Sequence, residues 1–189
     1  MGSHLLKFEK NLSKFLGCKH AIGVADGTAA LIFSLKAAGI KKGDEVILSS
    51  HTFIATASAV KSVGAIPVIC DCNEDSMMNV ESARAMINNK TKAIMPTQLN
   101  GRTCDMDEII KISKEHNLKI IEDSCQALGA KYKNKFAGLF GVAGSFSFYP
   151  AKTLGCFGDG GAVVTNDDNI ASYIRQLRDH GRDINGKVT

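Results

Sequence analysis

The sequence has no tryptophan, only three prolines and few aromatic residues, which make up 6% of its 189 positions. It has no apolar run long enough to span a bilayer and no visible signal peptide. Its 23 lysines and arginines are scattered among 19 acidic residues, and no basic run is interleaved with aromatic residues. These absences argue against a membrane protein and against nucleic acid as a partner, while a small anionic ligand stays compatible.

The six cysteines show no spacing typical of a disulfide framework, and a chain of this length does not need one. We therefore expect free thiols in a reducing, cytoplasmic protein. Cys70 and Cys72 form a CxC pair, but no second pair lies nearby, so buried packing cysteines are favoured over a zinc site. We expect no metal.

Hydrophobic residues make up 44% of the chain, which is enough for one substantial core. The first four residues, MGSH, look like the remnant of an expression tag, so we assign a single domain to residues 5–189. Within it, β-rich apolar runs alternate with segments of helical spacing. The predicted strands are 20–25, 45–48, 66–70, 92–95, 119–121, 145–149 and 161–165, and helical spacing covers 5–16, 28–39, 53–63, 80–88, 106–117 and 170–180.

This alternation predicts an α/β fold with a mostly parallel sheet and helices on both faces. Ligands of such sheets bind outside the carboxyl ends of the strands. The first strand ends in ADGTAAL, where Gly27 allows a tight turn and Thr28 starts a helix whose free N–H groups could hold a phosphate. Taken alone, this is also an ordinary helix cap. The dinucleotide fingerprint GxGxxG and the GxxxxGK[ST] loop are both absent, which disfavours a Rossmann-type nucleotide module.

Two further strand ends offer a ring and a carboxylate. Phe53 falls at a helix start in SSHTFIATASAV, where it fits a core contact or, alternatively, a stacking surface for an aromatic ligand. Asp123 stands at the exit of a buried strand in KIIEDSCQALGA, and a carboxylate there is costly unless something pairs with it. It could cap a helix or meet a ligand cation, and Gln126 would lie one helical turn further on if a helix starts there.

The stretch GSFSFYPAKTLGCFGDGG contains Ser147 and a single lysine, Lys152. A snorkelling surface lysine is the ordinary interpretation. The glycines around it favour another one, because glycine permits close approach of a ligand. A lysine that is desolvated among aromatic side chains loses its proton more readily and becomes a nucleophile.

Together these strand ends offer a phosphate cradle, a flat ring, a buried acid and a nucleophilic lysine. Pyridoxal 5'-phosphate (PLP) needs each of them: its aldehyde forms a Schiff base with lysine, its pyridinium N–H pairs with a carboxylate, and its phosphate needs N–H and hydroxyl donors. No single feature is specific for this cofactor, but the ordered set is.

The sequence resembles the PLP-dependent sugar aminotransferases of the DegT/DnrJ/EryC1/StrS group over nearly its whole length. The most specific matches are IIEDSCQALGA and SFSFYPAKTLGCFGDGGAVVTND, supported by FEKNLSKFLGCKHAIGVADGTAAL and LNGRTCDMDEI. The resemblance implies an aspartate-aminotransferase-like large domain, called fold type I among PLP enzymes. It also implies a homodimer with shared active sites.

By the same resemblance, two residues would be catalytic. Lys152 would bind PLP covalently, and Asp123 would pair with the pyridine nitrogen. The remaining contacts to the cofactor would come from Gly27, Thr28 and Ser147 at the phosphate, Phe53 on the ring face and Gln126 at the phenolic oxygen.

The implied reaction transfers an amino group, with glutamate as the expected donor, to a nucleotide-linked keto-sugar in amino-sugar biosynthesis. Many family members carry histidine where Tyr149 stands, and the pattern FYPxK…GDGG resembles the branch that acts on sugars with a keto group at C3. Family members also continue for about as long again, with a small C-terminal domain. Two alternatives stay open: a PLP-dependent sugar dehydratase, in which histidine replaces the lysine, and a non-catalytic regulatory protein on the same fold.

Overall fold

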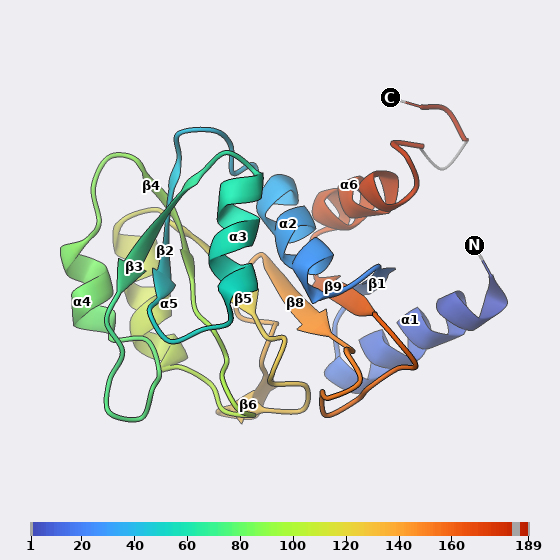
Figure 1. The fold of residues 1–189 in the computed structure, drawn as a ribbon, viewed down its shortest axis with the longest axis horizontal. Coiled ribbons are helices and arrows are strands. Elements are labelled where there is room, and N and C mark those ends of the chain that lie inside the picture. Colours follow the sequence, from blue (N-terminus) through green and yellow to red (C-terminus); the bar gives the residue numbers. More distant parts are fainter. Residues whose placement is uncertain (1, 183–185, 189) are drawn as a thin grey trace.

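The computed structural model describes residues 2–182 and 186–188, so the last part of the predicted domain lies partly outside the described residues. Its centre is a seven-stranded sheet of order β1-β9-β8-β5-β4-β2-β3, with helices on both faces (Figure 1). The strands are β1 His20–Val24, β2 Glu45–Ser49, β3 Ile66–Cys70, β4 Thr91–Met95, β5 Lys119–Asp123, β8 Ala143–Ser147 and β9 Gly161–Thr165. The helices are α1 Ser3–Leu16, α2 Gly27–Ala37, α3 Ile54–Ser62, α4 Val80–Ala85, α5 Met106–Glu115 and α6 Asp168–Arg178.

The sheet is mostly parallel, as predicted. Strands β3, β2, β4, β5 and β8 pair in parallel, whereas β9 runs antiparallel between β8 and β1. Because β1 and β8 are both antiparallel to β9, they point the same way as the rest of the sheet. The carboxyl ends of six strands and the start of β9 therefore meet at one edge.

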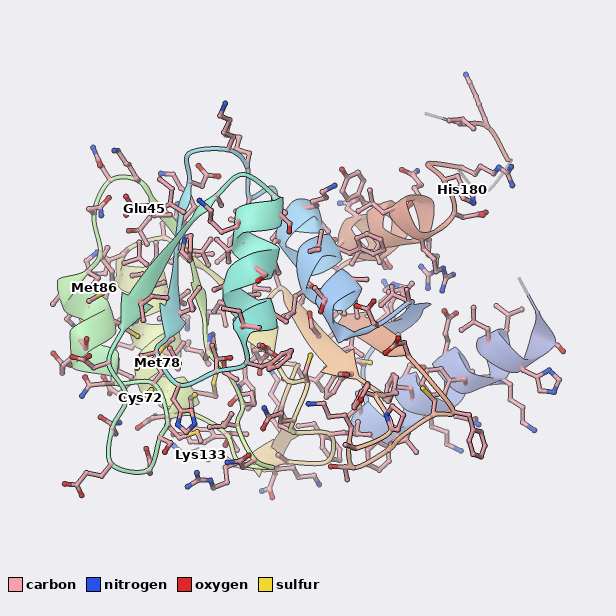
Figure 2. All side chains as sticks on the ribbon, in the orientation of Figure 1. Glu45, Cys72, Met78, Met86, Lys133 and His180 are labelled. Atoms are coloured by element: carbon pink, nitrogen blue, oxygen red, sulfur yellow. The ribbon has the colours of Figure 1, made fainter. Side chains whose placement is uncertain are left out.

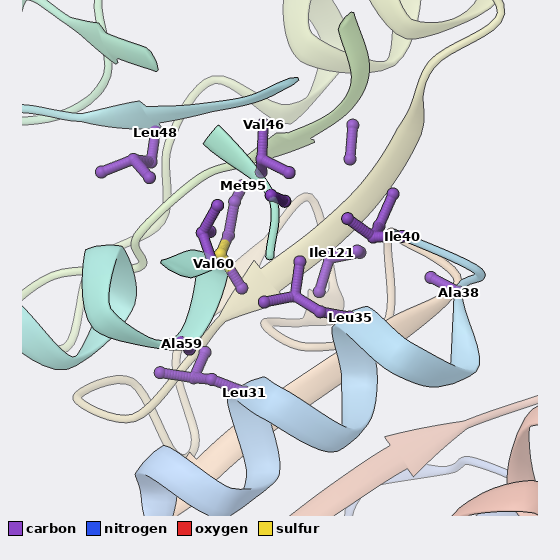
Figure 3. Close-up of a cluster of buried hydrophobic side chains, with 12 residues drawn as sticks. Leu31, Leu35, Ala38, Ile40, Val46, Leu48, Ala59, Val60, Met95 and Ile121 are labelled. Atoms are coloured by element: carbon purple, nitrogen blue, oxygen red, sulfur yellow. The ribbon is translucent and has the colours of Figure 1, made fainter. Parts of the chain in front are cut away.

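Apolar residues alternate between the two faces of the strands, as the period of a pleated strand requires. On one face, α2 and α3 pack on β2, β4 and β5 around Leu31, Leu35 and Val60 (Figure 3), and α6 packs with α2 on β1, β8 and β9. On the other face lie α1, α4 and α5. Met78 and Met86 belong to this second layer beside α4 (Figure 2). Burial on both faces explains why the strand sequences are almost continuously apolar.

The structure departs from the sequence-based elements in four places. Strand β8 begins two residues earlier than predicted, so Phe148 and Tyr149 follow the strand instead of ending it. No helix starts after Asp123, and Gln126 lies in a turn. The hairpin of β6 Lys131–Tyr132 and β7 Lys135–Phe136 was not predicted, because two-residue strands show no periodicity. Helix α1 begins at Ser3, within the four residues that were assigned to a tag remnant.

Glu122 on β5 is a fully buried carboxylate that links the sheet to the loop before β8. Its Oε1 accepts the N–H groups of Phe140 and Gly141, and its Oε2 accepts those of Gly138 and the Gln98 side chain, at 2.5–2.9 Å. Burial raises the pKa of Glu122, and the four N–H donors oppose that shift. No described helix is both long and apolar enough to cross a membrane.

Replacing Glu122 by glutamine should lower the free energy of unfolding by about 2–3 kcal/mol. One carboxylate oxygen becomes an NH2 group, which cannot accept hydrogen bonds, so the N–H donors on that side lose their acceptor. Urea denaturation of the purified chain measures this. Glu74 is exposed, so Glu74→Gln should change stability by less than about 0.5 kcal/mol. Equal stability of the two variants would show that the Glu122 network is not needed for the fold.

Candidate functional site

A cavity of about 530 Å³ lies at the edge where the strands end. Its wall comes from the β1–α2 turn, the segment after β2, the ends of β4, β5 and β8, and the loop between β8 and β9. This is the position expected for a ligand site in such a sheet. All seven residues predicted from the sequence line it: Gly27, Thr28, Phe53, Asp123, Gln126, Ser147 and Lys152.

The start of α2 and the end of β8 form a tight cradle. Asp26 caps α2, its side chain and carbonyl accepting the N–H groups of Ala29 at 2.7 Å and Ala30 at 3.1 Å. The N–H groups of Gly27 and Thr28 are left as donors at the cavity wall. A Cβ atom on Gly27 would lie 2.7 Å from the Cβ of Ser147, so only glycine fits here.

The cradle exists because β9 begins with a glycine. Strand β9 separates β1 from β8, and Gly161 pairs with Val24 on one side and Ser147 on the other. A Cβ on Gly161 would lie 2.3 Å from the carbonyl oxygen of Asp26. Without a side chain at this point, the β1–α2 turn reaches across β9 to the serine.

Asp123 presents a buried carboxylate at the cavity, with only 4% of the residue exposed. Its Oδ1 accepts the N–H of Cys125 at 3.1 Å, and its Oδ2 accepts the hydroxyl of Thr56 at 2.7 Å. Among the described residues, no lysine, arginine or histidine forms a salt bridge with it. A buried carboxylate is costly without a cationic partner, so the cavity is suited to a ligand with a positively charged N–H.

Phe53 precedes Asp123 in the sequence and Gln126 follows it, but both side chains line the same cavity. Phe53 is the N-cap residue of α3 and is 66% exposed, which is inconsistent with a core contact and leaves its ring free to cover a ligand. Gln126 accepts the N–H of Asn100 at 3.3 Å through its Oε1. Its side-chain amide N–H groups form no hydrogen bond with the described residues and can serve a ligand.

Lys152 lies on the glycine-containing loop between β8 and β9, and its backbone N–H bonds to the carbonyl of Tyr149 at 2.8 Å. In the described part of the chain, its side chain makes neither an ion pair nor a hydrogen bond. Tyr149 is exposed and also lines the cavity, as does Asp159. A lysine without a partner at the wall of a cavity is available to a ligand.

Sequence reasoning missed several lining residues, among them Thr52, Thr97 and Cys125. Each follows a strand by two or three positions, so the strand-end rule could have found them. Burial, reinforced by the charge of Asp123, raises the pKa of Cys125 well above its ordinary value, and its thiol stays neutral. Elsewhere, burial raises the pKa of Cys70 to about 12. The described residues contain no group of three or more potential metal ligands.

A model of the DegT/DnrJ/EryC1/StrS aminotransferase family matches residues 1–188. Among curated relatives, the chain is 43% identical over 183 residues to a pleiotropic regulatory protein of Geobacillus stearothermophilus, covering 96% of this chain and 49% of that protein. It is also 43% identical over 185 residues to the dTDP-3-amino-3,4,6-trideoxy-alpha-D-glucose transaminase of Streptomyces venezuelae, covering 96% and 48%.

Among solved structures, DesV from S. venezuelae, crystallised in complex with a ketimine intermediate, superposes with a TM-score of 0.93 at 42% identity. The match covers 96% of this chain and 49% of DesV. The chain thus spans about half the length of the relatives it matches.

Gly27→Ala should destabilise the cavity wall by about 1–3 kcal/mol, the usual cost of overpacking, since the new methyl group would meet Ser147 and the Cys125 thiol. Thermal unfolding without any ligand measures the loss. Adding Ser147→Gly removes the opposing Cβ and should restore part of it. A double variant no more stable than Gly27→Ala would contradict the packing explanation.

Proposed function

The chain belongs to the DegT/DnrJ/EryC1/StrS aminotransferase family, and on that premise we propose that it is the cofactor-binding part of a PLP-dependent sugar aminotransferase. The observation that carries the proposal is the shared cavity: an unpaired lysine and a buried carboxylate without a cationic partner face it together with a glycine-serine cradle. If Lys152 and Asp123 had only structural roles, we would not expect both side chains to face the same cavity.

The residues present fit PLP by their chemistry. Gly27, Thr28 and Ser147 would hold the phosphate, because two free N–H groups and two hydroxyls converge where a Cβ on Gly27 would intrude. The exposed ring of Phe53 would cover one face of the pyridine ring. Asp123 would hold its N–H.

The remaining two predicted contacts also suit the cofactor. The Gln126 amide would donate a hydrogen bond to the phenolic oxygen. Lys152 would form the covalent bond through its unpaired amine.

When bound, PLP supplies an electron sink that stabilises negative charge on the carbon next to the transferred nitrogen. The protein residues do the rest. Asp123 would hold a positive charge on the ring nitrogen, because Thr56 and Cys125 donate hydrogen bonds to its carboxylate and favour its ionised form. Lys152 would act as the general acid and base that moves a proton during the transfer.

The substrates are proposed from the relatives. A nucleotide-linked keto-sugar fits the Streptomyces transaminase, and its 3-amino product agrees with amination at C3, the position suggested by Tyr149 and the GDGG segment. Glutamate is the expected amino donor. We place the reaction in amino-sugar and polysaccharide biosynthesis.

A homodimer with shared active sites is part of the same proposal, because the segments that line the cavity carry exposed apolar residues, Phe53 and Ile54 after β2 and Phe157 on the loop between β8 and β9. A cytoplasmic location is also part of the proposal, because all six cysteines are free, as is usual in a reducing compartment.

A second function is favoured by one comparison, the relative named as a pleiotropic regulatory protein. A regulator on this fold would not need a reactive lysine, so the presence of Lys152 supports the enzyme. The same residue disfavours a sugar dehydratase, in which histidine is expected at that position.

Borohydride reduction of the PLP-loaded full-length protein should attach a pyridoxyl group to Lys152, and peptide mapping by mass spectrometry locates it. Lys152→Ala should abolish the label, whereas Lys61→Ala, which removes an exposed lysine of α3, should keep it. A label on another lysine would overturn the assignment, and labelling without transamination of any keto-sugar would favour the regulatory function.

A further inference from the structure

We propose that Thr56 is a positioning residue for Asp123, and that it acts as the last member of a chain of three threonine hydroxyls formed with Thr52 and Thr97. The inference rests on the proposed function, because it concerns how the carboxylate is aimed at the ring nitrogen of the cofactor. Thr56 does not line the cavity, so it acts only through Asp123.

The contacts form a continuous path. Thr56 on α3 is completely buried, and its Oγ1 lies 2.7 Å from Oδ2 of Asp123. Thr52 Oγ1 lies 2.6 Å from Thr56 Oγ1, and Thr97 Oγ1 lies 3.0 Å from Thr52 Oγ1. The three threonines come from the segment after β2, from α3 and from the end of β4, so the path joins three elements to the end of β5.

The direction of the hydrogen bonds follows from counting hydrogens. A hydroxyl donates one hydrogen bond and can accept two. The carbonyl of Phe53, 3.0 Å from Thr56 Oγ1, already accepts the backbone N–H of Thr56, so the carboxylate is the better acceptor for the Thr56 hydroxyl. Thr52 must then donate to Thr56, and Thr97 to Thr52. All three hydroxyl dipoles point toward Asp123.

The far end of the chain is fixed to the same backbone as the carboxylate. Thr97 lies in a parallel bridge with Asp123, and the flanking bonds join Asp123 N–H to Pro96 at 3.0 Å and Gln98 N–H to Asp123 at 2.8 Å. Thr97 therefore cannot shift relative to Asp123 without breaking these backbone hydrogen bonds.

The consequence is a carboxylate whose orientation is set by a hydrogen bond on each oxygen. Oδ2 is held by Thr56, and Oδ1 is held by the N–H of Cys125 at 3.1 Å. Each oxygen keeps a second lone pair, and Asp123 lines the cavity. Aligned donors also strengthen one another in a low-dielectric interior. Removing the Thr56 hydroxyl frees one oxygen and should weaken the bond to a cationic N–H without changing any group that touches the substrate.

The test compares Thr56→Val, which keeps the shape but removes the hydroxyl, with Thr56→Ser, which keeps the hydroxyl. Thr165→Val is the matched control, because Thr165 is a buried threonine whose hydroxyl donates to the carbonyl of Val142 at 2.7 Å and accepts the N–H of Asp167 at 3.1 Å, both outside the cavity. In the full-length protein, PLP affinity is measured by absorbance titration of the cofactor-free form. The donor half-reaction is followed in single turnovers over a range of glutamate concentrations.

For Thr56→Val, we expect PLP affinity and the maximal half-reaction rate each to fall about tenfold, the effect of losing one hydrogen bond to a charged group, with glutamate half-saturation unchanged. Thr56→Ser should stay within about threefold of the natural protein in both measurements. Thr165→Val should equal the natural protein in both. If Thr56→Val does not fold, Thr52→Val removes the donor to Thr56 and should shift both measurements in the same direction.

Wild-type affinity and rate in the valine variants would overturn the inference, as would equal losses in Thr56→Val and Thr56→Ser, which indicate packing alone. Failure of the proposed function can be distinguished from failure of this inference, because in that case the unmodified full-length protein would bind no PLP. A crystal structure of cofactor-free Thr56→Val gives a readout independent of activity. An unmoved Asp123 carboxylate there would also contradict the positioning role.

Discussion

Two adjacent carboxylates are buried at the end of β5, and much of the structure around them serves to compensate that burial. Successive side chains of a strand point to opposite faces, so Glu122 meets the loop before β8 and Asp123 meets α3. A buried charge is tolerated only with strong partners. Glu122 is surrounded by four N–H donors from the chain itself, whereas Asp123 has donors on both oxygens and no cation among the described residues.

This difference separates a structural carboxylate from the one that we propose binds the cofactor. Glu122 has no exposure and lies outside the cavity wall. Asp123 lies at that wall beside a tight anion cradle and a lysine without a partner. The described residues therefore leave one carboxylate without a cationic partner beside an anion cradle and a free amine, and under the proposed function a pyridinium, a phosphate and an aldehyde in one molecule would match all three.

The glycines extend the same logic to the backbone. At Gly27 and Gly161 the absence of a Cβ lets the β1–α2 turn approach Ser147 across an intervening strand. The cradle depends on three segments that lie far apart in the sequence, and each of them is ordinary when viewed alone. Only their packing brings backbone N–H groups and a serine hydroxyl to one point.

Much of the architecture was determined by the sequence itself, because hydrophobic period is a local property. The strand and helix order, the mostly parallel sheet and the strand ends that carry Gly27, Asp123 and Lys152 could all be predicted. The strand order, the antiparallel course of β9 and the exposure of Phe53 could not, since they depend on which faces pack together. The threonine chain could not be predicted either. Thr56 and Asp123 are 67 positions apart, and no local sequence pattern connects a hydroxyl on a helix to a carboxylate on a distant strand. This contact was decided by the tertiary structure, because the packing of α3 on the sheet determines which donors lie within hydrogen-bonding distance of the buried carboxylate.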